Sequence, residues 1–254
     1  MITPQYSLTD LQNLSSSAPY YQTATSNENI RQQAVQQAAE ALGMQAGLSA
    51  ESQQIDGILN GYGTRLDDIF NFNLVMYKNN VLPPVLTQDN DAMNINEQGD
   101  AVRIGGVTYK LLQQIRFVTA PPTWRDYLWM NYPEPQLPDK VLLPANSAEQ
   151  ALWKSSVTDG WNQGIQQAVT IYQINLHRLV QDYSGMVLYK KLLVANMISP
   201  YYVNKQNLGV TGDANEMVVD DQSWQITTKP ALQTKSSLWH PVLLQNDNGG
   251  ETGS

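Results

Sequence analysis

Hydrophobic residues recur at spacings of three and four in the first third of the chain, which predicts two amphipathic helices. The first is expected to begin at Thr25, because Thr25 and Glu28 have the spacing of a capping box. Its apolar face consists of Ile30, Ala34, Val35, Ala38, Leu42 and Ala46. A second pattern of the same period runs from Ile55 to Tyr77 and ends before Pro83-Pro84, which cannot continue a helix. We expect these two helices to pair as an antiparallel hairpin.

Small residues along this region predict close helix packing. Ala39, Gly43 and Gly47 recur every four residues, so they form a column against which another helix can approach closely. The segment Asn60-Gly61-Tyr62-Gly63 resembles part of a glycine-rich phosphate loop. It lacks the third glycine and follows no strand, so we interpret it as a kink or a packing site.

The middle of the chain is expected to combine a polar loop, a hairpin and a short helix. Residues 87–100 are polar, and Gly105-Gly106 then predicts a tight turn between strands at 102–104 and 107–109. Thr123 follows Pro121-Pro122 and is predicted to cap a short helix. That helix carries Trp124, Tyr127, Leu128 and Trp129. Residues 133–144 contain several prolines and are predicted to be an extended connection.

The second half opens with another capping box, Ser147-Ala148-Glu149-Gln150, and a helix expected to break near Asp159-Gly160 and to reach Tyr183. Its apolar seam comprises Trp161, Ile165, Ala168, Val169, Tyr172, Leu176, Leu179 and Tyr183. Gly185 is expected to interrupt this helix, which resumes from Met186 to Ile198. Strand chemistry follows, with a predicted turn at residues 220–223 between strands at 217–219 and 224–227.

These patterns predict an α+β fold. It would contain long helices (a helical hairpin plus a long interrupted helix) and one or two small antiparallel β-hairpin sheets. Residues 1–24 are expected to be a flexible arm, ordered only where it lies on a partner or on the body of the protein. Residues 25–244 would form a single domain, and residues 245–254 a flexible tail.

Charge disfavours nucleic acid as a direct partner. The chain of 254 residues has a net charge of −8, and its Lys and Arg residues do not cluster. Binding phosphates requires concentrated cations, so neither DNA, RNA nor an anionic membrane surface is an expected ligand. Residues 1–10 lack the pattern of a signal peptide, and no apolar run approaches the ~18 residues of a spanning helix. We therefore expect the chain as written to be soluble.

Candidate chemistry is sparse. The chain has no cysteine, which excludes disulfides, thiolate metal sites and cysteine nucleophiles. Its two histidines, His177 and His240, have no metal-binding spacing, and no Gly-x-Ser-x-Gly motif is present. The acidic segments 89–97 and 213–221 do not match a calcium-binding loop and are interpreted as solvated loops. We expect no catalytic residue, no metal and no cofactor, and hence a protein that is not an enzyme.

Residues 124–132 concentrate aromatic side chains around a single arginine, Arg125. Trp, Tyr and Arg often anchor protein interfaces, whereas aromatic residues at helical spacing are more often part of a core. Both interpretations stay open, with the core favoured for the segment as a whole.

Several blocks resemble the DotC family, whose TraI-type relatives occur in conjugative plasmids of the incompatibility I group. In chain order the blocks are Phe70-Asn71-Phe72-Asn73, Val81-Leu82-Pro83-Pro84-Val85-Leu86, Ala120-Pro121-Pro122-Thr123-Trp124-Arg125-Asp126-Tyr127-Leu128-Trp129-Met130, Gly160-Trp161-Asn162-Gln163-Gly164-Ile165, Gly185-Met186-Val187-Leu188-Tyr189, Asn196-Met197-Ile198-Ser199-Pro200 and Leu208-Gly209-Val210-Thr211-Gly212-Asp213. They keep the family's order and extend over roughly residues 40–232. An ordered set of blocks is more specific than any single motif.

The resemblance implies a lipoprotein of a type IVB (Dot/Icm or conjugative) secretion system. It implies a scaffold at the periplasmic face of the outer membrane, within a ring-shaped core complex for protein transport. The expected partners are a DotD-like lipoprotein and a DotH-like component, which the protein would help to place at the outer membrane. The family is attached through a lipid-modified cysteine, and this chain has no cysteine. Whether such a system transports effector proteins or conjugating DNA is left open.

We expect the partner-binding surface to lie around residues 124–132 and 199–213. The candidate residues are Trp124, Arg125, Tyr127, Trp129, Tyr132, Tyr201, Tyr202 and Leu208. An alternative function is a periplasmic peptidoglycan- or carbohydrate-binding protein, suggested by Trp and Tyr among many Asp, Asn and Gln. A calcium-dependent adhesion module is a further alternative.

Overall fold

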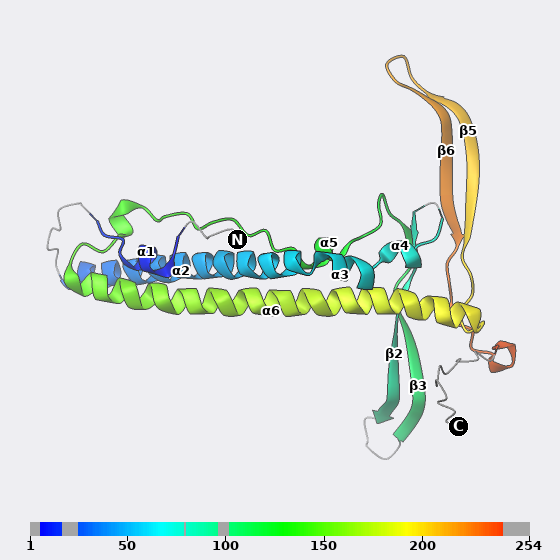
Figure 1. Ribbon diagram of the computed structural model, residues 1–254, viewed down its shortest axis with the longest axis horizontal. Coiled ribbons are helices and arrows are strands. Elements are labelled where there is room, and N and C mark those ends of the chain that lie inside the picture. The colour runs from blue at the N-terminus through cyan, green and yellow to red at the C-terminus, as the bar shows by residue number, and fades with distance from the viewer. Residues whose placement is uncertain (1–5, 17–24, 79, 96–101, 241–254) are drawn as a thin grey trace, which may run out of the picture. The chain divides into compact units, whose positions relative to one another are not determined.

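A computed structural model describes residues 6–16, 25–78, 80–95 and 102–240 (Figure 1). Within them, long helices occur with three separate two-stranded antiparallel sheets, which confirms the predicted α+β class. The chain divides into two compact units, Met1–Phe70 with Thr123–Leu179 and Asn71–Pro122 with Val180–Ser254. The arm, the single domain and the tail stay predictions, and the tail lies outside the described residues.

The first unit is helical. Its elements are α1 (Leu8–Gln12), α2 (Thr25–Gly61), α3 (Gly63–Ile69), α5 (Trp124–Leu128), the 3-10 helix η1 (Lys140–Leu142) and the first part of α6 (Ser147–Val194). The second unit contains the rest of α6 and the strands. Its other elements are α4 (Phe72–Val75), β1 (Val81–Leu82), β2 (Val85–Ile95), β3 (Val102–Gln113), β4 (Arg116–Phe117), β5 (Tyr202–Gly212), β6 (Met217–Thr228) and η2 (Ser236–Leu238).

In the first unit, α2 and α6 lie side by side and run in the same direction (Figure 1). Arg31 contacts Glu149, and Glu40 contacts Gly160, so the residue numbers rise together along both helices. The predicted antiparallel hairpin of residues 25–47 with 55–77 is therefore wrong. One helix continues to Gly61, because the best partner for its small-residue column is far away in the sequence.

Glycines on both helices produce this close parallel packing. A Cβ on Gly43 would overlap the carbonyl oxygen of Val157, and one on Gly160 would overlap that of Glu40. Gly47 and Gly164 have the same relation to backbone on the opposite helix. The predicted small-residue column is confirmed. The predicted break near Gly160 is wrong, because this glycine permits contact rather than a turn.

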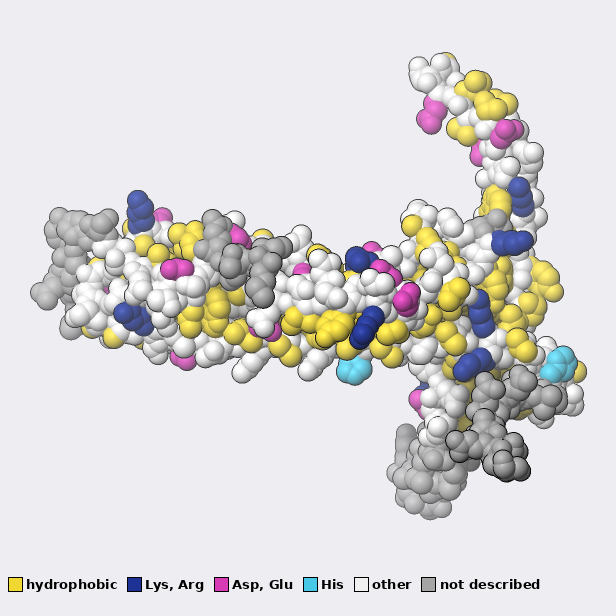
Figure 2. Space-filling view, viewed as in Figure 1, with side chains coloured by type: hydrophobic (Ala, Val, Ile, Leu, Met, Phe, Trp, Pro, Cys, Tyr) yellow, Lys and Arg dark blue, Asp and Glu magenta, His cyan; other side chains and the backbone are white. Residues whose placement is uncertain are grey.

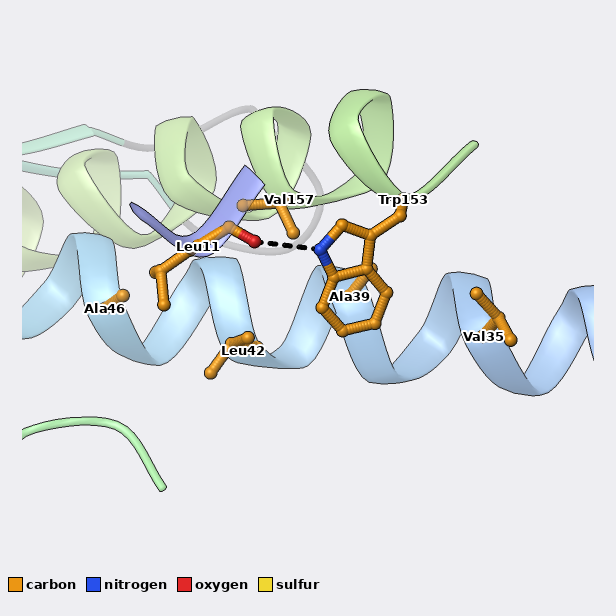
Figure 3. Packing of buried hydrophobic residues seen from close by; sticks show 7 residues of the cluster. All are labelled: Leu11, Val35, Ala39, Leu42, Ala46, Trp153 and Val157. Atoms are coloured by element: carbon orange, nitrogen blue, oxygen red, sulfur yellow. Dashed lines mark hydrogen bonds between the residues drawn. The ribbon is translucent and has the colours of Figure 1, made fainter. Parts of the chain in front are cut away.

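Buried apolar side chains fill the same interface. The cluster consists of Leu11, Val35, Ala39, Leu42, Ala46, Trp153 and Val157 (Figure 3). The indole N–H of Trp153 donates to the carbonyl oxygen of Leu11 at 2.9 Å, and Leu11 is fully buried. Leu11, which lies in the segment predicted to be an arm, thus packs into the first unit, and its burial removes apolar surface from water.

The start of α6 differs by one residue from the expected capping box. Asn146, not Ser147, caps the helix, because its side-chain oxygen accepts the Glu149 N–H at 2.8 Å. The Glu149 carboxylate then accepts the Ala145 N–H at 2.9 Å and binds Arg31 of α2 at 2.8 Å. The capping box at Thr25 stays a prediction, as the side chains of residues 25–27 lie outside those described.

In the second unit, α6 packs against the base of the β2–β3 hairpin. A Cβ on Gly185 would come within 2.6 Å of the Leu86 carbonyl oxygen, so this glycine serves packing and does not interrupt the helix as predicted. Leu86, Tyr189, Leu192 and Ile198 form the buried cluster there.

The β2–β3 hairpin replaces two features expected from the sequence. Residues 87–95 form a strand rather than a polar loop, and Gly105 pairs with Ala92 inside the ladder rather than forming a turn. The polar composition of this segment favoured a loop, and the two adjacent glycines favoured a turn. The strand is instead held at its base by buried apolar residues such as Leu86. Asp89, from the segment considered for calcium, binds Lys110 at 2.9 Å across this ladder.

Among the described residues, no helix has both the length and the apolar character needed to cross a membrane.

Candidate interaction surfaces

The α5 segment is positioned by its own cap. Pro121-Pro122 leads into Thr123, whose backbone N–H and hydroxyl both donate to the Asp126 carboxylate, at 2.6 and 2.9 Å. The short helix then runs from Trp124 to Leu128, as predicted. The cap thus places Trp124 and Leu128 on the buried side of α5 and leaves the other side of the helix exposed.

Trp124 belongs to the core of the first unit. Its side chain is fully buried, and its indole N–H donates to Asp67 of α3 at 2.7 Å. Arg125 binds the same carboxylate oxygen at 3.0 Å, and its guanidinium lies 4.3 Å from the centre of the Trp124 ring. Because a partner cannot reach a fully buried side chain, the core interpretation holds for Trp124.

The other α5 candidates remain near solvent. Arg125 and Trp129 are four residues apart and both exposed, with 44% of the Trp129 surface accessible. Tyr127 and Tyr132 are half-buried. We call the exposed Arg125 and Trp129, together with the half-buried Tyr127 and Tyr132, the α5 surface. Its composition, one guanidinium among large rings, is typical of residues that anchor interfaces.

Tyr201 packs against another tyrosine of the second unit. Its ring lies 5.0 Å from that of Tyr77, and the Tyr77 and Tyr189 rings lie 6.3 Å apart, edge to face. Burial raises the pKa of all three phenols above the ordinary value, and the pKa of Tyr189 is also raised by the neighbouring Tyr77 and Tyr201. Tyr201 therefore helps to fix the base of the following hairpin, whereas the adjacent Tyr202 is exposed.

The last hairpin is longer than the sequence indicated. The expected strands at 217–219 and 224–227 both belong to β6, so the turn predicted at residues 220–223 is wrong. The turn occurs at residues 213–216, where Asp213 accepts the N–H groups of Asn215 and Glu216 at 2.8 and 3.1 Å. These two hydrogen bonds lower the pKa of Asp213. The side-chain oxygen of Asp213 thus closes the turn, next to Gly212, whose φ angle is 141°.

No residue of β5 or β6 is buried. Leu208, one of the candidates, is 42% exposed, and further apolar residues missed by the sequence reasoning lie near it. They are Val210 (62% exposed), Met217 (69%), Val218 (42%) and Val219 (59%). We define residues 207–221 as the hairpin tip. The run Met217-Val218-Val219 was a usable signal, but it was interpreted only as a strand.

A family model for TraI-type proteins, described as type IV secretory system, conjugal DNA-protein transfer, matches residues 29–241. The chain belongs to this family. The match includes both groups of candidate residues, at 124–132 and 201–208, and all the blocks quoted for the resemblance. No curated protein matches the sequence.

As a TraI-type protein, the chain is a component of a type IV secretion or conjugation system and works in an envelope-associated complex with other components. In the TraI-type chain, the exposed candidates fall in two places: the α5 surface in the first unit and the region from Tyr202 to the hairpin tip in the second. Trp124 and, in part, Tyr201 serve internal packing.

Proposed function

We propose that this chain is a structural, non-enzymatic subunit of the outer-membrane core complex of its secretion system. It would lie at the periplasmic face of the outer membrane, where the family that it resembles is attached through a lipid. There it would act with a DotD-like lipoprotein to place a DotH-like component. The observation that carries the proposal is the β5–β6 hairpin, which exposes five large apolar side chains around its turn and buries none of its residues.

The physical basis is the cost of leaving such a hairpin in water. A two-stranded hairpin is marginally stable by itself, and clustered apolar side chains on a monomer's surface commonly mark protein interfaces. A subunit whose neighbours cover this surface in the assembled complex accounts for both features. The α5 surface offers a second contact, in which Trp129 and Arg125 would be the anchors.

Assembly can be tested by co-purification. The full chain, expressed from its own gene in cells that carry the whole secretion system, would be extracted from envelopes under native conditions. We expect DotD-like and DotH-like components to co-purify with it and the complex to band with the outer membrane in a density gradient. Recovery of the chain alone, or banding with the inner membrane, would contradict the proposal.

The absence of catalysis is a separate element of the proposal, supported by a family resemblance that brings no catalytic residues. Purified protein incubated with peptidoglycan sacculi is expected to release no soluble fragments. Release that depends on protein concentration would overturn the non-enzymatic assignment and favour the peptidoglycan-directed alternative.

A further inference from the structure

The hairpin tip combines acidic side chains with exposed apolar side chains. Four acidic residues, Asp213, Glu216, Asp220 and Asp221, lie within residues 207–221, and this segment contains no Lys or Arg. The five exposed apolar residues are interleaved with them. Figure 2 shows hydrophobic and acidic side chains together at the far end of β5–β6, with basic side chains nearer its base.

The acidic groups have no cationic counterpart in the described structure. No ion pair joins any of the four carboxylates to a Lys or Arg among the described residues, although Asp221 accepts a hydrogen bond from the Thr211 hydroxyl at 2.6 Å. Backbone hydrogen bonds lower the pKa of Asp213, because they stabilise its charged form. The tip thus carries an uncompensated negative field around an apolar centre.

The backbone of the tip disfavours strand addition by a partner. The β5–β6 register shifts between Asn207 and Gly209 and again between Gly209 and Thr211. Gly209 and Asp220 have positive φ angles of 71° and 58°. Bulges and irregular edges interrupt the regular row of N–H and C=O groups that an added strand would need. Side chains rather than the backbone edge are therefore the groups available for docking.

We propose that the hairpin tip inserts into an apolar groove, flanked by Lys or Arg residues, on a different protein of the same complex. This proposal deepens the proposed function and rests on it for the existence of neighbouring subunits. Charge decides between the possible occupants. A second copy of this chain would bring the same net charge of −8, and an anionic lipid surface would repel four carboxylates. A basic protein surface attracts them, and such attraction steers docking and fixes its register.

Site-specific photo-cross-linking tests this inference. A benzoylphenylalanine at Met217, in the full chain within cells carrying the secretion system, is expected to cross-link to one other protein. The cross-linked peptide should belong to a surface with Lys or Arg beside apolar residues. A product consisting of two copies of this chain, an adduct to lipid alone, an acidic partner surface, or no adduct would each overturn the proposal.

Matched substitutions separate docking from folding. Val210→Asp is expected to lower the cross-link yield about tenfold, the scale of an interface anchor, while Ile174→Asp on α6 leaves it unchanged. Ile174 is a suitable control because it is 61% exposed, close to the 62% of Val210. Equal yields for the two variants would contradict the inference.

A charge variant supplies a test that does not depend on the apolar substitution. Glu216→Gln with Asp220→Asn keeps side-chain size and, at position 220, a residue type that tolerates positive φ. We expect a lower cross-link yield at low salt and a weaker dependence on salt than in the unsubstituted chain. An unchanged salt dependence would overturn the basic-groove assignment. Normal co-purification of secretion components alongside failed tip variants would leave the proposed function standing.

Discussion

At the residue scale, the absence of a side chain is as informative as its presence. Gly57 and Gly160 are both inside helices of the first unit, but a Cβ on Gly57 meets nothing within 4 Å, whereas one on Gly160 overlaps the backbone at Glu40. The same residue type is therefore a packing requirement at one position and a helix-weakening residue at the other.

Gly160→Ala is expected to destabilise the protein by about 1–3 kcal/mol, because the helices must separate to admit the methyl group. Gly57→Ala is the control and should stabilise by about 0.5–1 kcal/mol, since alanine favours an exposed helical site. Urea unfolding followed by circular dichroism measures both. Equal stability of the two variants would show that α2 and α6 are not packed through these glycines.

The Arg31–Glu149 pair makes a second residue-scale prediction. Glu149 is 2% exposed and also accepts the Ala145 N–H, so Glu149→Gln leaves Arg31 without its counter-charge at a partly buried site. We expect a loss of about 3 kcal/mol in unfolding free energy. Asp89→Asn, which removes the exposed Asp89–Lys110 pair, should cost about 1 kcal/mol or less. A comparable cost for both in urea titrations would refute the buried-pair interpretation.

The tyrosine cluster predicts a stability change at alkaline pH. Burial raises the pKa of Tyr77, Tyr189 and Tyr201 above the value of about 10 in an unfolded chain. The folded state therefore retains protons that the unfolded state releases, and stability should fall as pH rises above about 10. Tyr189→Phe should make this fall shallower, measured by urea unfolding at pH 8 and 10.5. Tyr202→Phe tests whether removal of any phenol has the same effect, a result that would count against the cluster.

At the element scale, the two long hairpins of the second unit differ in what holds them. The base of β2–β3 contributes buried Leu86 to the cluster around Tyr189, whereas β5–β6 contributes no buried residue. The base of β5–β6 is closed separately, by hydrogen bonds between Ser199 and Ala231 at 2.9 Å. The length of β5–β6 therefore adds little to the stability of the described fold.

A shortened hairpin tests this difference. Lys205 and Trp224 pair directly, so an Asn-Gly turn can replace residues 206–223. We expect the melting temperature to stay within about 2 °C of the original, because no buried apolar surface is lost. Co-purification of partner proteins should be lost. A large fall in melting temperature by calorimetry would show that the hairpin supports the fold itself.

At the scale of the whole molecule, each compact unit has its own buried cluster. The first centres on Trp153 and the α2–α6 glycines, the second on Tyr189 and Leu86. Stability can therefore differ between the units, although α6 supplies residues to both.

Hydrogen exchange measures this directly. Gly160→Ala should increase amide exchange mainly in α2 and in residues 147–179, while residues 80–90 and 106–117 keep their protection. Mass spectrometry of peptides from both units provides the comparison. A uniform increase across all peptides would indicate one cooperative unit instead.

Local signals predicted the parts of the fold that depend on neighbours in sequence. The α5 cap at Thr123 and the column formed by Gly43 and Gly47 were predicted correctly, because capping and side-chain volume act within a few residues. The interruptions at Gly160 and Gly185 were wrong. Glycine is compatible both with a turn and with a close helix contact, and only the partner helix or strand distinguishes them.

For the candidate interaction residues, too, the sequence indicated the segment but not which of its side chains are buried. Aromatic composition indicated residues 124–132, yet it could not separate Trp124, which binds Asp67 inside the first unit, from the exposed Trp129. Likewise Leu208 was selected within residues 199–213, whereas the exposed Val210 of the same segment was not, and Met217 lay outside the segment.

By itself, the sequence determined the α+β class, the existence of the long helices and, through its ordered blocks, the membership in a type IV secretion family. The tertiary structure decided which elements pair. It placed α2 parallel to α6 and anchored β2–β3 on Tyr189, and it left every residue of β5–β6 unburied. The physical reason is that period and propensity act along the chain, whereas burial depends on partners a hundred residues away.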